Sequence, residues 1–230
     1  MGQGARRKAG RGHAIVAPMQ KKSSSPKSHG TPRLAPRQVR IIGGAWKRAL
    51  LPVLEAEGLR PTPDRVRETV FNWINHQIGG DWGGSTFLDL FAGSGALGFE
   101  AASRGAASVT MVDNHTPAAR QLEANRDKLK AANVKVLRTD ALALVRDLAA
   151  RGQRFDVIFL DPPYQLGLLS QLLPLSTAIL EEGGMVYAET GEPLPLEDEI
   201  PDWLAGWEAV RADKAGMVYY YLLKPRENQA

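Results

Sequence analysis

Short apolar runs alternate with helix-patterned stretches through the middle of this chain, and the alternation limits the possible folds more than any other feature. The apolar runs lie near residues 86–91, 108–112, 134–138, 155–160 and 184–188. The helical stretches lie near residues 96–103, 117–131, 141–150 and 166–180. Strands that alternate with helices in this way pack as a parallel sheet with right-handed crossovers.

The two ends of the chain depart from this alternation. Near the C-terminus, Trp207 to Asp213 and Met217 to Leu223 flank the turn Lys214-Ala-Gly216, which predicts an antiparallel hairpin. Near the N-terminus, residues 39–53 predict a basic hairpin. Residues 63–77 predict a helix, because apolar side chains recur there at helical spacing. We therefore predict an α/β fold with a seven-stranded, mostly parallel sheet, a reversed last strand, and an N-terminal β-hairpin and helix.

The charge is distributed unevenly along the 230 residues. The first 54 residues carry twelve Lys or Arg and no Asp or Glu, whereas the remainder carries 17 basic against 25 acidic residues. Residues 1–36 are rich in Gly, Ser, Pro and Lys, so we expect a disordered basic arm. The arm can contact nucleic-acid phosphates, or it can be a solubilising extension. We divide the rest into a hairpin and helix extension, 37–80, and a catalytic domain, 81–230.

Composition excludes several classes of site. The chain has no cysteine, which excludes disulfides, zinc-thiolate centres and a cysteine nucleophile, and favours a reducing cytoplasm. Its four histidines are scattered, without the spacing of a metal site, so we expect no metal. No apolar run approaches the roughly 20 residues that span a bilayer, so we expect no membrane association.

A glycine-rich turn follows the first of the central strands. The segment reads Phe87-Leu-Asp89-Leu-Phe-Ala-Gly93-Ser-Gly95-Ala-Leu-Gly98. Gly93 and Gly95 permit backbone angles and a close ligand approach that a Cβ would prevent. The spacing also satisfies the dinucleotide fingerprint, so an NAD-type ligand must be considered. However, Asp89 would repel a pyrophosphate there, and a carboxylate suits the cationic amino-acid part of a sulfonium cofactor.

Acidic residues follow the next two strands. Asp113 ends the second strand, twenty positions after Gly93, at the usual distance for a carboxylate that binds ribose hydroxyls. Asp140 follows the third strand, where it could accept a hydrogen bond from an adenine amino group. For both residues the alternative is an ordinary solvated loop carboxylate. Glu189, after the fifth strand, could line the same cleft or be a common edge charge.

The fourth strand ends at Asp161-Pro162-Pro163-Tyr164. Two prolines supply no amide hydrogens, so the Asp161 carboxylate and nearby backbone carbonyls remain as acceptors without local donors. Such acceptors can hold an exocyclic amine, and Tyr164 offers a face on which a base can stack. The alternative is an ordinary turn, because Asp-Pro is common at turns.

Together these motifs resemble a known family. Asp-Leu-Phe-Ala-Gly-Ser-Gly, followed about seventy positions later by Asp-Pro-Pro-Tyr, is similar to the S-adenosylmethionine-dependent amino-methyltransferases. Two upstream segments, Arg60-Pro-Thr62-Pro-Asp64-Arg-Val-Arg67-Glu68 and Val39-Arg-Ile-Ile-Gly-Gly-Ala-Trp46, narrow the resemblance. They resemble the RsmD family of 16S ribosomal RNA guanine-N2 methyltransferases, over roughly Val39 to Leu223. The fold implied is the Rossmann-like class I methyltransferase fold.

The resemblance also implies a role for each motif. The glycine turn, with Asp89, Gly93 and Gly95, would bind the methionine part of S-adenosylmethionine. Asp113 would bind the ribose and Asp140 would meet the adenine. Asp161, Pro162 and Tyr164 would receive the target base and form the catalytic group. Thr62 and Arg65 would border the amino-acid end of the cofactor, unless the Arg-Pro-Thr segment only begins a helix.

The substrate implied is 16S ribosomal RNA, in the small subunit or an assembly intermediate, and nothing requires more than a monomer. Three alternatives stay open. One is an amino-methyltransferase acting on adenine or cytosine in DNA or RNA. The second is an NAD-dependent oxidoreductase, although such domains usually lack a reversed last strand. The third is a non-catalytic RNA-binding factor that keeps only the fold.

Overall fold

The computed structural model describes residues 1, 38–53, 62–163, 167–197 and 199–226. The described residues from 38 onward belong to one compact unit. The predicted basic arm, apart from residue 1, lies outside the described residues. Within the described part, no helix is both long and apolar enough to cross a lipid bilayer.

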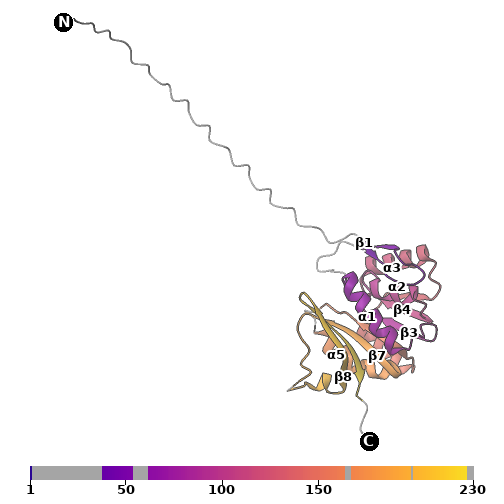
Figure 1. The fold of residues 1–230 in the computed structure, drawn as a ribbon. Helices are drawn as coiled ribbons and strands as arrows, with labels where there is room; N and C mark the ends of the chain where they lie inside the picture. Colours follow the sequence, from indigo (N-terminus) through magenta and orange to yellow (C-terminus); the bar gives the residue numbers. More distant parts are fainter. Residues whose placement is uncertain (2–37, 54–61, 164–166, 198, 227–230) are drawn as a thin grey trace. The chain divides into compact units, whose positions relative to one another are not determined.

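The described elements follow the chain in the order that the colours of Figure 1 trace. The strands are β1 (Gln38–Arg40), β2 (Leu50–Pro52), β3 (Thr86–Asp89), β4 (Ser108–Val112), β5 (Val134–Leu137), β6 (Phe155–Leu160), β7 (Leu180–Thr190), β8 (Trp207–Ala215) and β9 (Val218–Pro225). The helices are α1 (Asp64–Gln77), α2 (Ala96–Ser103), α3 (Thr116–Leu129), α4 (Ala141–Ala150), α5 (Leu168–Ser176) and α6 (Asp202–Ala205), with a short 3-10 helix at Thr177–Ile179.

The central sheet has the strand order β5-β4-β3-β6-β7-β9-β8. The first five strands in this order are parallel, whereas β9 is antiparallel to both β7 and β8. The predicted seven-stranded sheet with a reversed last strand is therefore confirmed. The predicted N-terminal hairpin is also present, as the antiparallel pair β1 and β2.

The sequence prediction differs from the structure in a few elements. The strand predicted at 184–188 extends over Leu180–Thr190, where β7 pairs with β6 from its first residue. The helix predicted at 166–180 is shorter, because α5 ends at Ser176 and a 3-10 turn follows. Pro174 lies within α5 and removes one backbone donor near its end. The four-residue α6 is too short to show a helical period.

Both faces of the sheet are covered, and strand alternation decides which residue faces which layer. Phe87 and Phe159 belong to a buried cluster that includes apolar residues of α1, α2 and α3. Their chain neighbours Leu88 and Leu160 belong to a second cluster with residues of α4 and α5, and α5 lies against β7 (Figure 1). Each such side chain contributes roughly 1.5–3 kcal/mol when fully buried.

The N-terminal elements are fastened to α2 by one buried carboxylate. Glu100 accepts hydrogen bonds from the backbone amides of Ile42 and Gly43, at 2.7 and 2.8 Å. It also pairs with Arg104 at 2.9 Å, and Arg67 lies 3.7 Å from its second oxygen. Because a buried charge is costly unless it is paired, this network explains how the hairpin and α1 are held against the sheet.

Candidate active site

Three acidic side chains meet at the carboxyl ends of adjacent parallel strands. Asp89 of β3 is in register with Phe159 of β6, which is in register with Tyr187 of β7. One pair further along, Leu160 is opposite Ala188, so Asp161 and Glu189 follow side by side. Neighbouring strands lie about 4.8 Å apart, and alternation turns all three carboxyl groups toward the face that α1 covers. The sequence places each carboxylate at a strand end, and the sheet order brings them together.

Asp89 is almost completely buried, with 2% of its surface exposed. Its Oδ2 accepts the backbone N–H of Gly98, in the first turn of α2, at 3.1 Å. Burial raises the pKa of Asp89 to about 7, while the amides of Gly98 and Phe91 lower it and the Asp113 charge raises it. The fold therefore holds a carboxyl group that costs free energy to ionise unless a cation approaches it.

The glycine turn is joined to the loop after β4 through Asp113. Gly93 has a φ of 50° and donates its N–H to Asp113 Oδ2 at 3.0 Å. The other oxygen, Oδ1, accepts the N–H of His115 at 2.8 Å. Asp113 thus fixes the two loops in which the resemblance places the methionine and ribose parts of the cofactor.

Gly95 precedes α2 in the left-handed region, with a φ of 79°. A Cβ at this position would lie 2.5 Å from the ring of Phe99 and 2.7 Å from Leu122. The need for glycine at position 95 therefore comes from backbone conformation and the packing of α2 and α3. The prediction that Gly95 binds the cofactor remains a prediction.

Asp161 begins the predicted base-binding segment. Burial raises the pKa of the Asp161 carboxyl well above its usual range, and the nearby charges of Glu189 and Asp89 raise it further. Pro162 is buried and Pro163 is exposed. Tyr164, the predicted stacking residue, lies outside the described residues.

Glu189 joins the site through bonds that sequence spacing does not reveal. Its Oε1 accepts the hydroxyl of Thr62 at 2.8 Å and the hydroxyl of Tyr187 at 2.7 Å, and the residue is 3% exposed. Thr62 therefore does not cap α1, whose N-cap is Pro63 without a side-chain bond. The buried Arg67 donates Nε–H to the carbonyl of Thr62 at 3.2 Å and so helps to hold that residue in place.

Two other predicted residues have partners elsewhere. Asp140 is exposed and caps α4, accepting the N–H of Ala143 at 2.9 Å. Arg65 is exposed on α1, and its charge helps to lower the pKa of Asp213, after the Lys214 amide and the Tyr220 hydroxyl. Arg65 thus has an acidic neighbour in the hairpin of β8 and β9, and its predicted cofactor contact stays a prediction, as does that of Asp140.

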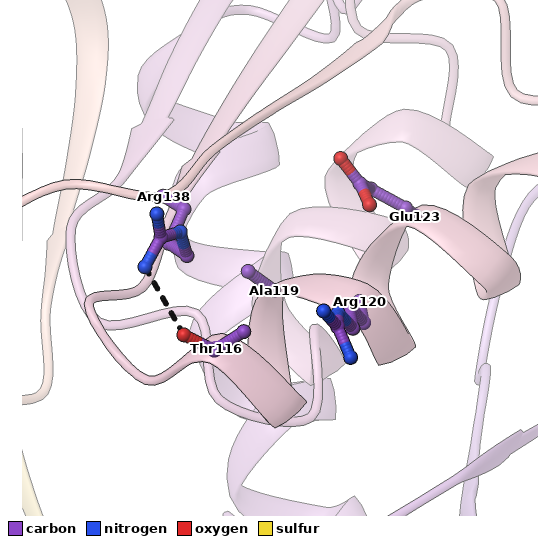
Figure 2. A pocket seen from close by; sticks show the side chains of 5 residues that line it. All are labelled: Thr116, Ala119, Arg120, Glu123 and Arg138. Atoms are coloured by element: carbon purple, nitrogen blue, oxygen red, sulfur yellow. Dashed lines mark hydrogen bonds between the residues drawn. The ribbon is translucent and has the colours of Figure 1, made fainter.

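A shallow surface depression of about 250 Å³ lies near the loops after β4 and β5 (Figure 2). Its lining residues are Thr116, Ala119, Arg120, Glu123 and Arg138. Arg138 donates to the Thr116 hydroxyl at 3.1 Å across it. None of the predicted site residues lines this depression, although Thr116 and Arg138 are close in sequence to Asp113 and Asp140.

The cluster of three carboxyl side chains suits an organic cation. Among the described residues, no Lys, Arg or His forms a salt bridge with Asp89, Asp161 or Glu189. No group of acidic or histidine side chains in the described part has the arrangement of a metal site. Buried carboxylates without a cation partner are unfavourable, so a positively charged ligand would stabilise them. The ammonium and sulfonium groups of S-adenosylmethionine meet this requirement.

Comparisons with known proteins agree with this chemistry. The family described as Conserved hypothetical protein 95 matches residues 39–224. Ribosomal RNA small subunit methyltransferase D of Escherichia coli is 40% identical over 194 residues, which cover 84% of this chain and 92% of that protein. The solved structure of the putative methyltransferase yhhF from Escherichia coli is 38% identical and has a TM-score of 0.67, covering 82% of this chain and 98% of that one.

A more distant structure shares the fold alone. SMU.776, a putative methyltransferase complexed with SAH, is 18% identical with a TM-score of 0.60. The match covers 82% of this chain and 56% of that chain. The overall fold is therefore shared by proteins whose sequences have diverged widely.

Proposed function

Because this chain belongs to the family described as Conserved hypothetical protein 95, whose match spans most of its length, we propose that it transfers a methyl group from S-adenosylmethionine to 16S ribosomal RNA. The family membership bears out the resemblance drawn from the glycine turn and the Asp-Pro-Pro-Tyr segment. The acceptor atom that we propose is the exocyclic N2 amine of a guanine. The enzyme is thus an S-adenosylmethionine-dependent methyltransferase.

The observation that supports this function most is the cluster of three carboxyl side chains, Asp89, Asp161 and Glu189, beneath the glycine turn. S-adenosylmethionine supplies an electrophilic methyl group next to a positively charged sulfur. Asp89 would hold the ammonium of its methionine part, and Asp113 and Asp140 would hold the ribose and adenine. A dinucleotide fits this position poorly, because its pyrophosphate would meet a buried carboxylate at Asp89.

Guanine N2 is a weak nucleophile because its lone pair is delocalised into the ring, so the protein must supply geometry. We place the flipped base on Tyr164, with the Asp161 carboxyl and the Pro162 carbonyl accepting its two amino hydrogens. Holding the nitrogen in line with the methyl group removes much of the entropic barrier. As positive charge grows on nitrogen, the buried carboxyl groups stabilise it and then receive the proton.

Labelled methyl transfer to small subunits that lack the modification tests the function. The parent protein should transfer label to 16S RNA, and mass spectrometry should locate the new methyl on guanine N2. Asp161→Ala should lose most turnover and still bind S-adenosylhomocysteine. Glu182→Ala is a matched control, because Glu182 is exposed at the opposite end of β7. Label on an adenine or cytosine, or transfer by Asp161→Ala at the parent's rate, would contradict the assignment.

The context of the substrate is a finer part of the same proposal. We place the enzyme in the cytoplasm as a monomer, acting on a small subunit or assembly intermediate. The rates of methyl transfer to naked 16S RNA and to undermethylated subunits, compared at equal RNA concentration, show which of the two is the substrate. Sedimentation of the free enzyme tests the monomer.

A further inference from the structure

Glu189 is a buried acidic group for which the proposed transfer so far assigns no separate task. It follows Ala188, which pairs with Leu160, so it lies beside Asp161 at the ends of two paired parallel strands. Both hydrogen bonds that it accepts from Thr62 and Tyr187 reach Oε1. No hydrogen bond from another described residue reaches Oε2, which leaves that oxygen available to Asp161.

The groups around Glu189 come from four elements and are mostly acidic or neutral. Asp161 follows β6, and Asp89 ends β3 on the same face of the sheet. Tyr220 of β9 pairs with Glu189, but its hydroxyl is directed to Asp213 at 2.8 Å. Arg67 of α1 donates a hydrogen bond to the carbonyl of Thr62, the residue whose hydroxyl bonds Glu189. The Arg67 guanidinium itself pairs with Asp64 at 2.6 Å. No described cation therefore neutralises Glu189 directly.

We propose that Glu189 is a positioning residue that acts through Asp161, as the final acceptor of the proton that the amine loses on methylation. This inference rests on the proposed function. Asp161 would carry one proton and donate it to Glu189 Oε2, while its second oxygen accepts the amine hydrogen. Thr62 and Tyr187 would hold the ionised Glu189 in place for this bond.

The step balances in atoms and charge. The bond from sulfur to the methyl carbon breaks and the bond from that carbon to the amine nitrogen forms. One N–H bond breaks, its proton moves to the free oxygen of Asp161, and the proton already on Asp161 moves to Glu189. Asp161 is neutral before and after, while Glu189 changes from ionised to neutral as the positive charge on sulfur disappears.

Two physical facts favour this arrangement over two independent carboxylates. Adjacent buried carboxylates cannot both ionise without a large cost, so such a pair holds one proton between them. Donors to one member of the pair stabilise its ionised form, and here both donors serve Glu189. In agreement, burial raises the pKa of both groups, and the Tyr187 and Thr62 hydroxyls lower that of Glu189, whereas no hydrogen-bond donor is among the causes of the shift at Asp161.

Steady-state kinetics against pH test the relay with Glu189→Gln and Thr62→Val. Glu189→Gln keeps an oxygen for both donors but cannot take a proton, so kcat should fall about a hundredfold while KM for RNA stays within about twofold. Its acid limb, which reports ionisation of the pair in the parent, should move to lower pH, because Asp161 then titrates without a neighbouring carboxylate. Thr62→Val removes a donor to the ionised Glu189, so its acid limb should move to higher pH. Glu182→Gln, at the far end of β7, should match the parent.

The infrared C=O stretch of a protonated carboxyl gives a readout that does not depend on activity. The unliganded parent should show this band at pH 7, and Glu189→Gln should lose the part that belongs to Asp161. Asp89 contributes to both spectra because its pKa is raised to about 7, so the difference between them isolates the pair.

Two results would overturn the relay and leave Glu189 a structural residue. One is an equal infrared band in the parent and in Glu189→Gln. The other is a pH profile of Glu189→Gln that keeps the parent's shape with a uniformly lower kcat. If the parent does not methylate small-subunit RNA, the proposed function fails, yet the infrared comparison still tests the shared proton. The two proposals therefore fail in distinguishable ways.

Discussion

Substitution of Asp89 by asparagine should change how the free energy of unfolding depends on pH. Asp89 is buried and accepts the N–H of Gly98. Asparagine has nearly the same shape and keeps an oxygen for that bond, but it does not ionise. The variant therefore removes one titration and leaves the packing of β3 against α2 nearly unchanged.

The size of the effect follows from the pKa. Burial raises the pKa of Asp89 from 3.8 to about 7, a difference of about 3 units, and each unit corresponds to about 1.4 kcal/mol. The raised pKa means that the folded state favours the protonated carboxyl. Its stabilising contribution is complete below pH 3.8 and is lost as pH rises through about 7. From pH 4.5 to 8, the parent should lose about 3 kcal/mol relative to Asp89→Asn.

Urea unfolding of both proteins at several pH values measures this difference. Asp161 and Glu189 titrate in both proteins, so their contributions cancel except for the part that the Asp89 charge adds to the raised pKa of Asp161, and this part acts in the same direction. Asp202→Asn serves as the control, because Asp202 is exposed in the first turn of α6. Two results would refute the assignment of a raised pKa to Asp89. The stability difference between parent and variant could stay constant within about 0.5 kcal/mol from pH 4.5 to 8, or the parent could gain stability relative to Asp89→Asn as pH rises.

The same variant connects stability with cofactor binding. An ammonium group beside Asp89 would favour the ionised carboxylate and lower its pKa. Saturating S-adenosylhomocysteine, which retains this ammonium, should therefore flatten the pH dependence of the parent and leave that of Asp89→Asn little changed. An equal effect of the ligand on both proteins would place the ammonium elsewhere.

Three further substitutions test separate parts of the structure. Gly95→Ala should lower the free energy of unfolding by about 3 kcal/mol in urea titrations, because the backbone there has positive φ and the methyl group would meet Phe99. Asp113→Ala should weaken S-adenosylhomocysteine binding about tenfold by calorimetry and lower thermal stability modestly, because the amides of Gly93 and His115 lose their acceptor; unchanged affinity would contradict the ribose role. Glu100→Gln should cost about 3 kcal/mol in thermal unfolding, because it removes the buried charge that pairs with Arg104 and lies 3.7 Å from the buried Arg67, and a stable variant would show that this network is dispensable.

Most elements of the fold could be predicted because each depends on neighbours in sequence. The short apolar runs that form β4 and β6, and the helical stretches that form α2 and α4, agree with the structure at both ends. The predicted boundaries were wrong where strand pairing or a proline decided them. Thus β7 is longer than predicted and α5 is shorter. The short α6 carried no periodic signal at all.

The site was predictable only in part. Asp89, Asp113 and Asp161 follow from motifs at strand ends, so their positions could be expected from the sequence. The hydroxyl of Thr62 is different, because it bonds Glu189 across 127 residues and could equally have capped α1. Likewise, Asp140 caps α4 and Arg65 lies near Asp213, partners that a motif does not specify.

The sequence by itself determined the types and order of the elements and the family, because hydrophobic period and turn residues act over short distances. The tertiary structure alone decided that β3, β6 and β7 end side by side, with three carboxyl groups on one buried face. Burial raises the pKa of all three groups, nearby like charges raise those of Asp89 and Asp161 further, and both effects depend on contacts between residues far apart in the chain.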